Sequence, residues 1–143
     1  MAARIRPAAR RTAADMRSTG VWHPRLIEVI AAMGHTDTLV VADAGLPVPA
    51  GVECIDLLWS RGQPELMPVL CAVLSDLGVE SATIANEMDG PMLDAVSAAL
   101  DSIPVDRVGH DELKAAVGGA RAVVRTGETT PYANVILRAG VVF

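Results

Sequence analysis

Short apolar runs alternate with longer amphipathic stretches along this chain, and the alternation predicts strands separated by helices. Strand-length apolar runs occur at residues 38–42, 54–59, 81–85, 105–108, 121–125, 135–137 and 141–143. Helical patterns lie between them, at residues 24–33, 64–77, 92–100 and 111–117. Pro24 is well placed in the first turn of the first helix, and Gly34 is a typical residue to end it.

This order of elements predicts an α/β fold: a three-layer α/β/α sandwich with a largely parallel, mixed sheet. The strands predicted at 135–137 and 141–143 are joined by a short link, so we expect them to pair antiparallel and make the sheet mixed. Residues 16–143 are expected to form a single domain, because a chain of 143 residues fits one packed core. Residues 1–15 are rich in Ala and Arg, and we predict a flexible N-terminal extension there, with an organelle-type presequence as the alternative.

Composition adds an expectation about assembly. Hydrophobic residues make up 51% of the chain and aromatic residues only 3%, and the mean hydropathy is +0.36. A small protein this apolar is expected to cover part of its surface with further copies of itself. The net charge is −5, and beyond residue 15 the chain has eight basic and sixteen acidic residues. This balance argues against a nucleic-acid partner.

The chain shows no signal for a membrane or for export. No apolar run approaches the roughly 18 residues of a membrane span, and no apolar segment follows the N-terminal arginines as in a secretory signal. Cys54 and Cys71 do not have the spacing of metal ligands and are expected to be reduced thiols. We therefore expect a cytoplasmic protein with no membrane partner.

Residues 34–47 place polar groups at both ends of the apolar run at 38–42. His35 precedes the run, and an imidazole suits proton transfer in both directions near neutral pH. Asp43 follows the run, and ligands of open α/β sheets gather beyond the carboxyl ends of strands. We expect both to serve one polar site, within the chain or with a neighbouring copy. The alternatives are a loop histidine and an Asx turn, and Asp37 either orients the His35 ring or belongs to a turn.

A second group of candidates lies later in the chain. His110 is at the predicted start of a helix, where it is either a ligand contact or a substitute for an N-cap. Tyr132, Ala133 and Asn134 place a phenol, backbone groups and an amide on one loop, which suits a polyhydroxylated ligand. A tyrosine packed under a strand is the ordinary alternative.

Other chemistries find little support in the sequence. His35, Asp37 and Asp43 do not follow a metal-ligand spacing, and neither a Gly-x-Gly-x-x-Gly motif nor a P-loop nor a Gly-x-Ser-x-Gly motif occurs. Glu87 and Glu128 are acidic candidates by position, and we interpret them as ordinary ends of strands. No metal or redox cofactor is expected.

Several motifs, taken in order, resemble one known family. They are Gly-His-Thr-Asp at 34–37, Asp-Ala-Gly-Leu-Pro at 43–47, His-Asp-Glu-Leu-Lys at 110–114, Arg-Thr-Gly-Glu at 125–128, Pro-Tyr-Ala-Asn at 131–134 and Ala-Gly-Val-Val-Phe at 139–143. This series resembles the ribose pyranase branch of the RbsD/FucU sugar mutarotase family, and the resemblance covers residues 16–143. Each motif alone would be weak evidence, but the ordered set is specific.

The resemblance implies an isomerase that interconverts the pyranose and furanose forms, and the anomers, of D-ribose. It implies that His35 is the general acid, that Asp43, His110, Tyr132, Ala133 and Asn134 bind the sugar, and that neither a metal nor a cofactor takes part. It further implies a homo-oligomer, a ring-like decamer, with the site completed at a subunit boundary. The alternatives are a mutarotase for fucose or another aldose, a non-catalytic sugar-binding accessory protein and, more remotely, a metal-dependent hydrolase.

Overall fold

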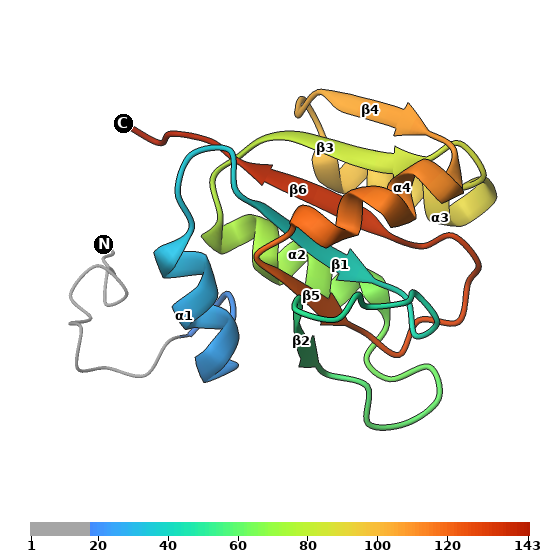
Figure 1. Cartoon of the computed structure of the whole chain (residues 1–143), viewed down its shortest axis with the longest axis horizontal. Coiled ribbons are helices and arrows are strands. Elements are labelled where there is room, and N and C mark those ends of the chain that lie inside the picture. Colours follow the sequence, from blue (N-terminus) through green and yellow to red (C-terminus); the bar gives the residue numbers. More distant parts are fainter. Residues whose placement is uncertain (1–17) are drawn as a thin grey trace, which may run out of the picture.

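The computed structural model describes residues 18–143, in which all the apolar runs but the last form strands and the amphipathic stretches form helices (Figure 1). The strands are β1 (Thr38–Ala42), β2 (Glu53–Asp56), β3 (Val79–Ala85), β4 (Val105–Val108), β5 (Ala122–Arg125) and β6 (Val135–Ala139). The helices are α1 (Pro24–Ala32), α2 (Leu66–Asp76), α3 (Gly90–Leu100) and α4 (His110–Ala116), the last continued by the short 3₁₀ helix η2 (Val117–Gly119). The extension predicted for residues 1–15 lies outside the described residues.

The strands form one sheet in the order β2-β5-β1-β6-β3-β4. Strand β6 runs antiparallel to both of its neighbours, β1 and β3, whereas the other neighbouring pairs are parallel. The prediction of a largely parallel, mixed sheet is therefore confirmed. The predicted pairing of 135–137 with 141–143 is wrong, because β6 already has a neighbour on each edge and residues 141–143 form no strand.

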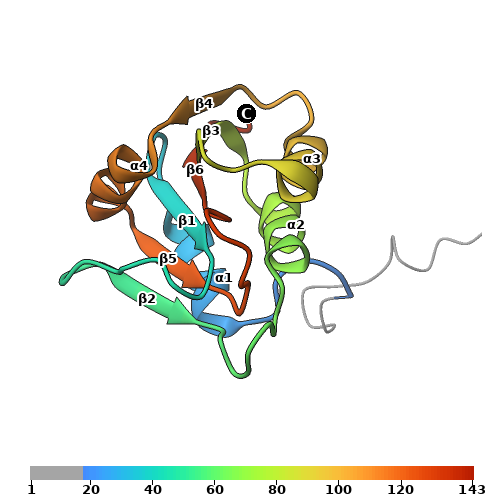
Figure 2. The ribbon, with the colours of Figure 1, turned by 90° about the vertical axis from the view of Figure 1, so that its right-hand side faces the viewer.

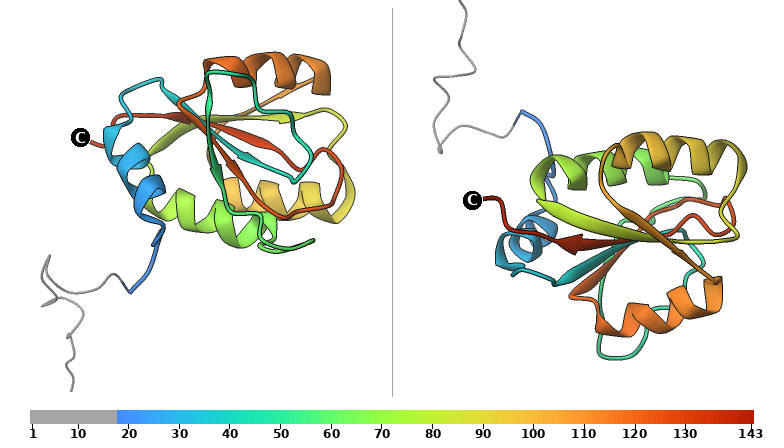
Figure 3. Two further views of the ribbon diagram at one scale, coloured as in Figure 1. Left: turned by 60° about the horizontal axis from the view of Figure 1, so that its bottom comes forward. Right: turned by 90° about the horizontal axis from the view of Figure 1, so that it is seen from above.

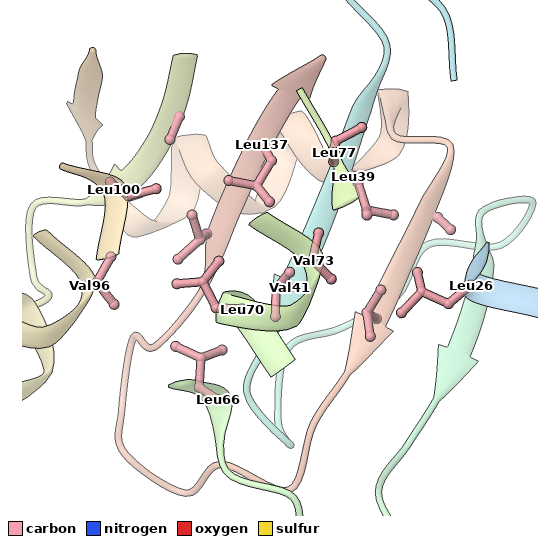
Figure 4. Packing of buried hydrophobic residues seen from close by; sticks show 14 of the residues in the cluster. Leu26, Leu39, Val41, Leu66, Leu70, Val73, Leu77, Val96, Leu100 and Leu137 are labelled. Atoms are coloured by element: carbon pink, nitrogen blue, oxygen red, sulfur yellow. The ribbon is translucent and has the colours of Figure 1, made fainter. Parts of the chain in front are cut away.

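Helices cover both faces of the sheet, so the prediction of three layers is also confirmed (Figures 2 and 3). Along β1, Leu39 and Val41 belong to the core under α1, α2 and α3, while Val40 and Ala42 belong to the core under α4. This alternation is the period of two that a strand buried on both faces requires. Figure 4 shows the larger core, in which side chains of α2 and α3 meet β1 and β6: Leu66, Leu70, Val73, Val96, Leu100, Leu39, Val41 and Leu137.

The connecting loops lie along the two edges of the sheet at which its strands begin and end, and the direction of each strand determines the edge. The carboxyl ends of the parallel strands and the start of β6 share one edge, which holds the loops at 43–52, 57–65 and 126–134. The turn between α1 and β1 lies at the opposite edge, beside the end of β6 (Figure 1). No helix within residues 18–143 is long and apolar enough to cross a membrane.

Candidate functional site

The core of the candidate site is a pair of side chains at the ends of two adjacent strands. Asp43 directly follows β1 and Asn134 directly precedes β6, and because these strands are antiparallel neighbours the two residues meet. The Asn134 amide nitrogen donates to Asp43 Oδ2 over 3.1 Å, and Asn134 Oδ1 accepts from the Asp43 backbone N–H over 2.8 Å. Asn134 is fully buried. Asn134 therefore fixes the orientation of the Asp43 carboxylate through one of its two oxygens.

Burial and hydrogen bonds act in opposite directions on Asp43. Desolvation by burial raises the pKa of its carboxyl group above the ordinary value, against hydrogen bonds from the Gly45 and Leu46 amides and from Asn134. The Gly45 N–H reaches Asp43 Oδ1 over 3.0 Å, so the Asx turn considered for Asp43 is present. A turn and a ligand contact do not exclude one another, because a carboxylate has about four acceptor positions.

His110 and Tyr132 form a second pair at the same edge of the sheet. Their ring centroids are 5.0 Å apart with an interplanar angle of 78°, which is an edge-to-face contact. His110 is the first residue of α4, and its backbone N–H donates to the Glu87 carboxylate over 3.0 Å. Tyr132 has φ 62°, an uncommon left-handed conformation for a residue other than Gly, and its carbonyl accepts from the Asn134 N–H over 2.9 Å. The loop thus joins the two pairs.

One nitrogen of this cluster lacks a partner. His110 Nδ1 is buried and makes no hydrogen bond within the described chain. Buried polar atoms are almost always hydrogen-bonded, so an orphaned ring nitrogen beside a phenol and a carboxylate fits a site that gains a polar partner on binding. Ala133 is fully buried in the core between Tyr132 and Asn134 and therefore holds the loop in place.

An open hollow of about 380 Å³ lies beside the Asp43 carboxylate, lined by residues 43–45 and 128–131. Glu128 shapes its wall: Oε1 accepts from the Leu66 N–H at the start of α2 over 2.9 Å, and Oε2 accepts from the Thr130 hydroxyl over 2.7 Å. Burial would raise the pKa of the Glu128 carboxyl group, but these hydrogen bonds outweigh burial and lower it. The interpretation of Glu128 and Glu87 as ordinary ends of strands is therefore incomplete. Their carboxylates accept hydrogen bonds from the first backbone N–H groups of α2 and α4.

His35 does not belong to this cluster within one chain. It precedes β1, whereas Asp43 follows β1, so a five-residue strand separates them, about 16 Å at the usual rise per residue. For this reason the expectation that His35 and Asp43 serve one site within a single chain is wrong. The alternative, that they serve one site together with a neighbouring copy, stays a prediction. The His35 side chain is 54% exposed, and its Nε2 lies 2.8 Å from Glu80 Oε1.

The hypothesis that Asp37 orients the His35 ring is also wrong. Asp37 Oδ2 accepts from the Gly34 N–H over 2.9 Å and from Arg121 Nη1 over 2.8 Å, and these bonds lower the pKa of the Asp37 carboxyl group. Asp37 is therefore a turn residue, the alternative considered for it. Glu80, the actual partner of the ring, was missed because it lies 45 residues away in sequence and belongs to no motif.

Of the six residues predicted from the sequence, the structure brings the side chains of Asp43, His110, Tyr132 and Asn134 together, buries Ala133 in the core beside them and places His35 elsewhere. The cluster combines carboxylate, amide, phenol and imidazole groups, and a hollow lies beside its carboxylate, which suits hydrogen bonding to several hydroxyls. Across residues 18–143, no three His, Cys, Asp or Glu side chains are grouped so that they could hold a metal ion.

Comparisons with known proteins identify the family of this chain. Residues 16–142 match the model of the RbsD / FucU transport protein family. The chain is 50% identical over 131 residues to a D-ribose pyranase of Coprothermobacter proteolyticus and 48% identical to one of Laribacter hongkongensis, in each case covering 90% of this chain and 100% of the relative.

Solved structures give the same result. The structure of Bacillus subtilis RbsD complexed with D-ribose superposes with a TM-score of 0.85 at 37% identity, covering 90% of this chain and 100% of that chain. A fucose mutarotase from Streptococcus pneumoniae, in complex with L-fucose, has a TM-score of 0.73 at 24% identity over 85% of this chain and 94% of its own, and shares the fold. The chain accordingly belongs to the RbsD/FucU family.

Proposed function

We propose that this protein is an isomerase that interconverts the pyranose and furanose forms, and the anomers, of D-ribose. The observation that carries the proposal is the polar cluster of Asp43, Asn134, His110 and Tyr132, set in a chain of which 90% matches a ribose-bound protein. Relatives at 48–50% identity are D-ribose pyranases, which supports ribose as the substrate.

The reaction needs only proton transfer and sugar binding. In ring opening, His35 gives a proton to the ring oxygen, the bond from that oxygen to C1 breaks, and the C1 hydroxyl loses its proton to a base, which leaves an aldehyde. In closure, a different hydroxyl adds to C1 and passes its proton to His35, which ring opening left neutral, while the carbonyl oxygen takes the proton back from the protonated base. Both protons are returned, so no redox partner is consumed. A positioned acid of this kind contributes about 10²- to 10⁴-fold.

The binding residues have distinct roles in this proposal. The Asp43 carboxylate, held by Asn134, accepts hydrogen bonds from sugar hydroxyls, and His110 Nδ1 and the Tyr132 hydroxyl provide further polar contacts. The backbone around Ala133 fixes the loop. Because Asp43 is held before the sugar arrives, binding does not have to order it.

His35 is proposed to act on the sugar bound by a second copy of the chain. A general acid must come within hydrogen-bond reach of the atom that it protonates, and a strand's length separates His35 from Asp43 in one chain. The half-exposed His35 ring and the high mean hydropathy support an interface between copies. We propose a homo-oligomer, a decamer, that acts in the cytoplasm, where the free Cys54 and Cys71 thiols would stay reduced.

Saturation-transfer NMR of D-ribose tests the function. We expect the protein to accelerate exchange between ring forms and anomers, and His35→Ala to lose about 10²- to 10⁴-fold of the acceleration. His23→Asn is the matched control, because it removes another imidazole but keeps an acceptor at the cap of α1. Ribose binding without faster exchange would identify a sugar-binding accessory protein instead, and faster exchange of L-fucose than of ribose would identify a fucose mutarotase.

A further inference from the structure

Glu80 lies at an irregularity in the sheet. In the pairing of β3 with β6, Val79 opposes Ala139 and Ser81 opposes Arg138, so Glu80 is the extra residue of a β-bulge. A bulge re-aims the side chain that it carries, and bulges are common next to active sites. Without it, Glu80 would share the face of Ala82, which belongs to the core under α1, α2 and α3. With it, the Glu80 carboxylate reaches the ring of His35.

The bulge depends on a glycine in the facing strand end. A Cβ atom on Gly140 would lie 2.9 Å from Glu80 Cβ, closer than real Cβ atoms approach, and in a tight contact of 3.3 Å with Glu80 N. The Gly140 N–H donates to the Gly78 carbonyl over 2.9 Å, which holds the two segments together. The position of Glu80 is therefore fixed by backbone packing rather than by the ion pair itself.

The turn that carries His35 is tied to the same place. The Thr36 N–H donates to the Ala139 carbonyl over 2.9 Å, and the Ala139 N–H donates to the Asp37 carbonyl over 2.8 Å. Thr36 has φ 73°, a left-handed conformation that is uncommon for Thr and marks a turn held by its surroundings. His35 and Glu80 are thus both anchored on residues 139 and 140, which fixes their separation.

We propose that Glu80 is a positioning residue that holds His35 Nε2 and leaves Nδ1 as the nitrogen that exchanges a proton with the sugar. This inference rests on the proposed function of His35. A neutral imidazole that donates its Nε2–H to the Glu80 carboxylate has its free acceptor at Nδ1. The carboxylate of Asp37, two residues along the chain, already accepts from Gly34 and Arg121. Surface ion pairs this exposed add little stability, so positioning explains the arrangement better than stabilisation does.

Three variants of the full-length chain test the proposal. Glu80→Ala removes the hydrogen-bond acceptor, Glu80→Gln keeps an acceptor oxygen without the charge, and Glu28→Ala removes a carboxylate from another exposed salt bridge, with Arg25. Ribose exchange gives kcat and KM, light scattering gives the oligomeric mass, and ¹⁵N NMR of the neutral His35 ring gives the tautomer. We expect Glu80→Ala to lower kcat about tenfold or more with KM within about twofold, because Glu80 does not touch the sugar.

The tautomer provides the readout that a merely structural role would not change. We expect two well-separated ¹⁵N shifts for the ring of the parent and Glu80→Gln, and partial averaging of the two shifts in Glu80→Ala. We also expect Glu80→Gln and Glu28→Ala to keep kcat within about threefold of the parent. A Glu80→Ala variant of parental mass and parental kcat overturns the proposal, as do unchanged ¹⁵N shifts. If the parent does not accelerate ribose exchange, the proposed function fails, and the ¹⁵N shifts still decide whether Glu80 holds Nε2.

Discussion

The Asn134 side chain makes two hydrogen bonds with Asp43. Its amide oxygen accepts from the Asp43 backbone N–H over 2.8 Å, and its amide nitrogen donates to the Asp43 carboxylate over 3.1 Å. These bonds join the end of β1 to the start of β6, so they connect the sheet directly to the candidate sugar site. Because Asn134 is fully buried, water cannot take over its hydrogen bonds to Asp43.

Asn134→Ala is expected to destabilise the protein and to weaken sugar binding together. The Asp43 N–H would lose its acceptor, and an unsatisfied buried group costs about 1–3 kcal/mol in the free energy of unfolding. Urea denaturation and ribose titration measure the two effects. Asn86→Ala, at an exposed position at the same edge, should change neither. Unchanged ribose affinity in Asn134→Ala would contradict the assigned role of the Asp43–Asn134 pair.

The raised pKa of Asp43 predicts a definite dependence on pH. Burial raises the pKa of this carboxyl group above the ordinary 3.8, so in ¹³C NMR titration Asp43 should titrate at a higher pH than Asp56, whose pKa is lowered by Arg125. Ribose affinity should fall as the pH is lowered through the raised pKa, because a protonated carboxyl loses acceptor capacity.

The same shift acts on stability in the opposite direction. The unfolded chain ionises Asp43 more readily than the folded chain, so between the two pKa values the folded state binds more protons and stability falls as the pH rises. Above the folded-state pKa, ionised Asp43 lowers the free energy of unfolding, and this loss disappears as the pH falls through that pKa. Asp43→Asn should remove this contribution, and a variant with the parental pH dependence of stability would contradict the assigned shift.

Gly127 joins two loops at the candidate site, and Gly127→Ala tests that junction. A Cβ atom there would lie 2.4 Å from the Gln63 backbone nitrogen, and neither backbone can move easily because the Gly127 N–H donates to the Pro64 carbonyl. We expect a loss of about 1–3 kcal/mol in the free energy of unfolding. Gly118→Ala, where a Cβ atom would meet nothing within 4 Å, is the matched control and should stay within about 0.5 kcal/mol of the parent. Equal effects of the two substitutions would contradict this reading.

Local patterns predicted most of the fold. The strands expected at 38–42 and 105–108 coincide with β1 and β4, because each is a short run bounded by turn residues. The insertion of β6 between β1 and β3 was not predicted, because it depends on pairing between segments far apart in the chain. The prediction of a strand at 141–143 failed for the same reason, since apolar character alone does not reveal whether a sheet has a free edge.

The site was predicted in part, and the limit has a physical cause. Asp43 and Asn134 are 91 residues apart, yet both flank strands, and the resemblance to a family identified them together. His35 and Asp43 are close in sequence, yet β1 carries them to opposite edges of the sheet. Glu80 was not found, because a β-bulge and a facing glycine have no distinctive signature in one sequence.

Mixing inactive variants tests whether two copies share each site. His35→Ala lacks the proposed acid and Asp43→Ala lacks the proposed sugar acceptor, so each oligomer alone should be nearly inactive in ribose exchange. If His35 of one copy serves the cluster of another, random assembly of equal amounts restores both groups at about one quarter of the sites. Activity should therefore return on co-refolding, with the oligomeric mass unchanged by light scattering. The double variant His35→Ala, Asp43→Ala mixed with His35→Ala contains no intact His35 and should stay inactive. If the first mixture also stays inactive at parental mass, each copy must supply its own acid, and the shared site is ruled out.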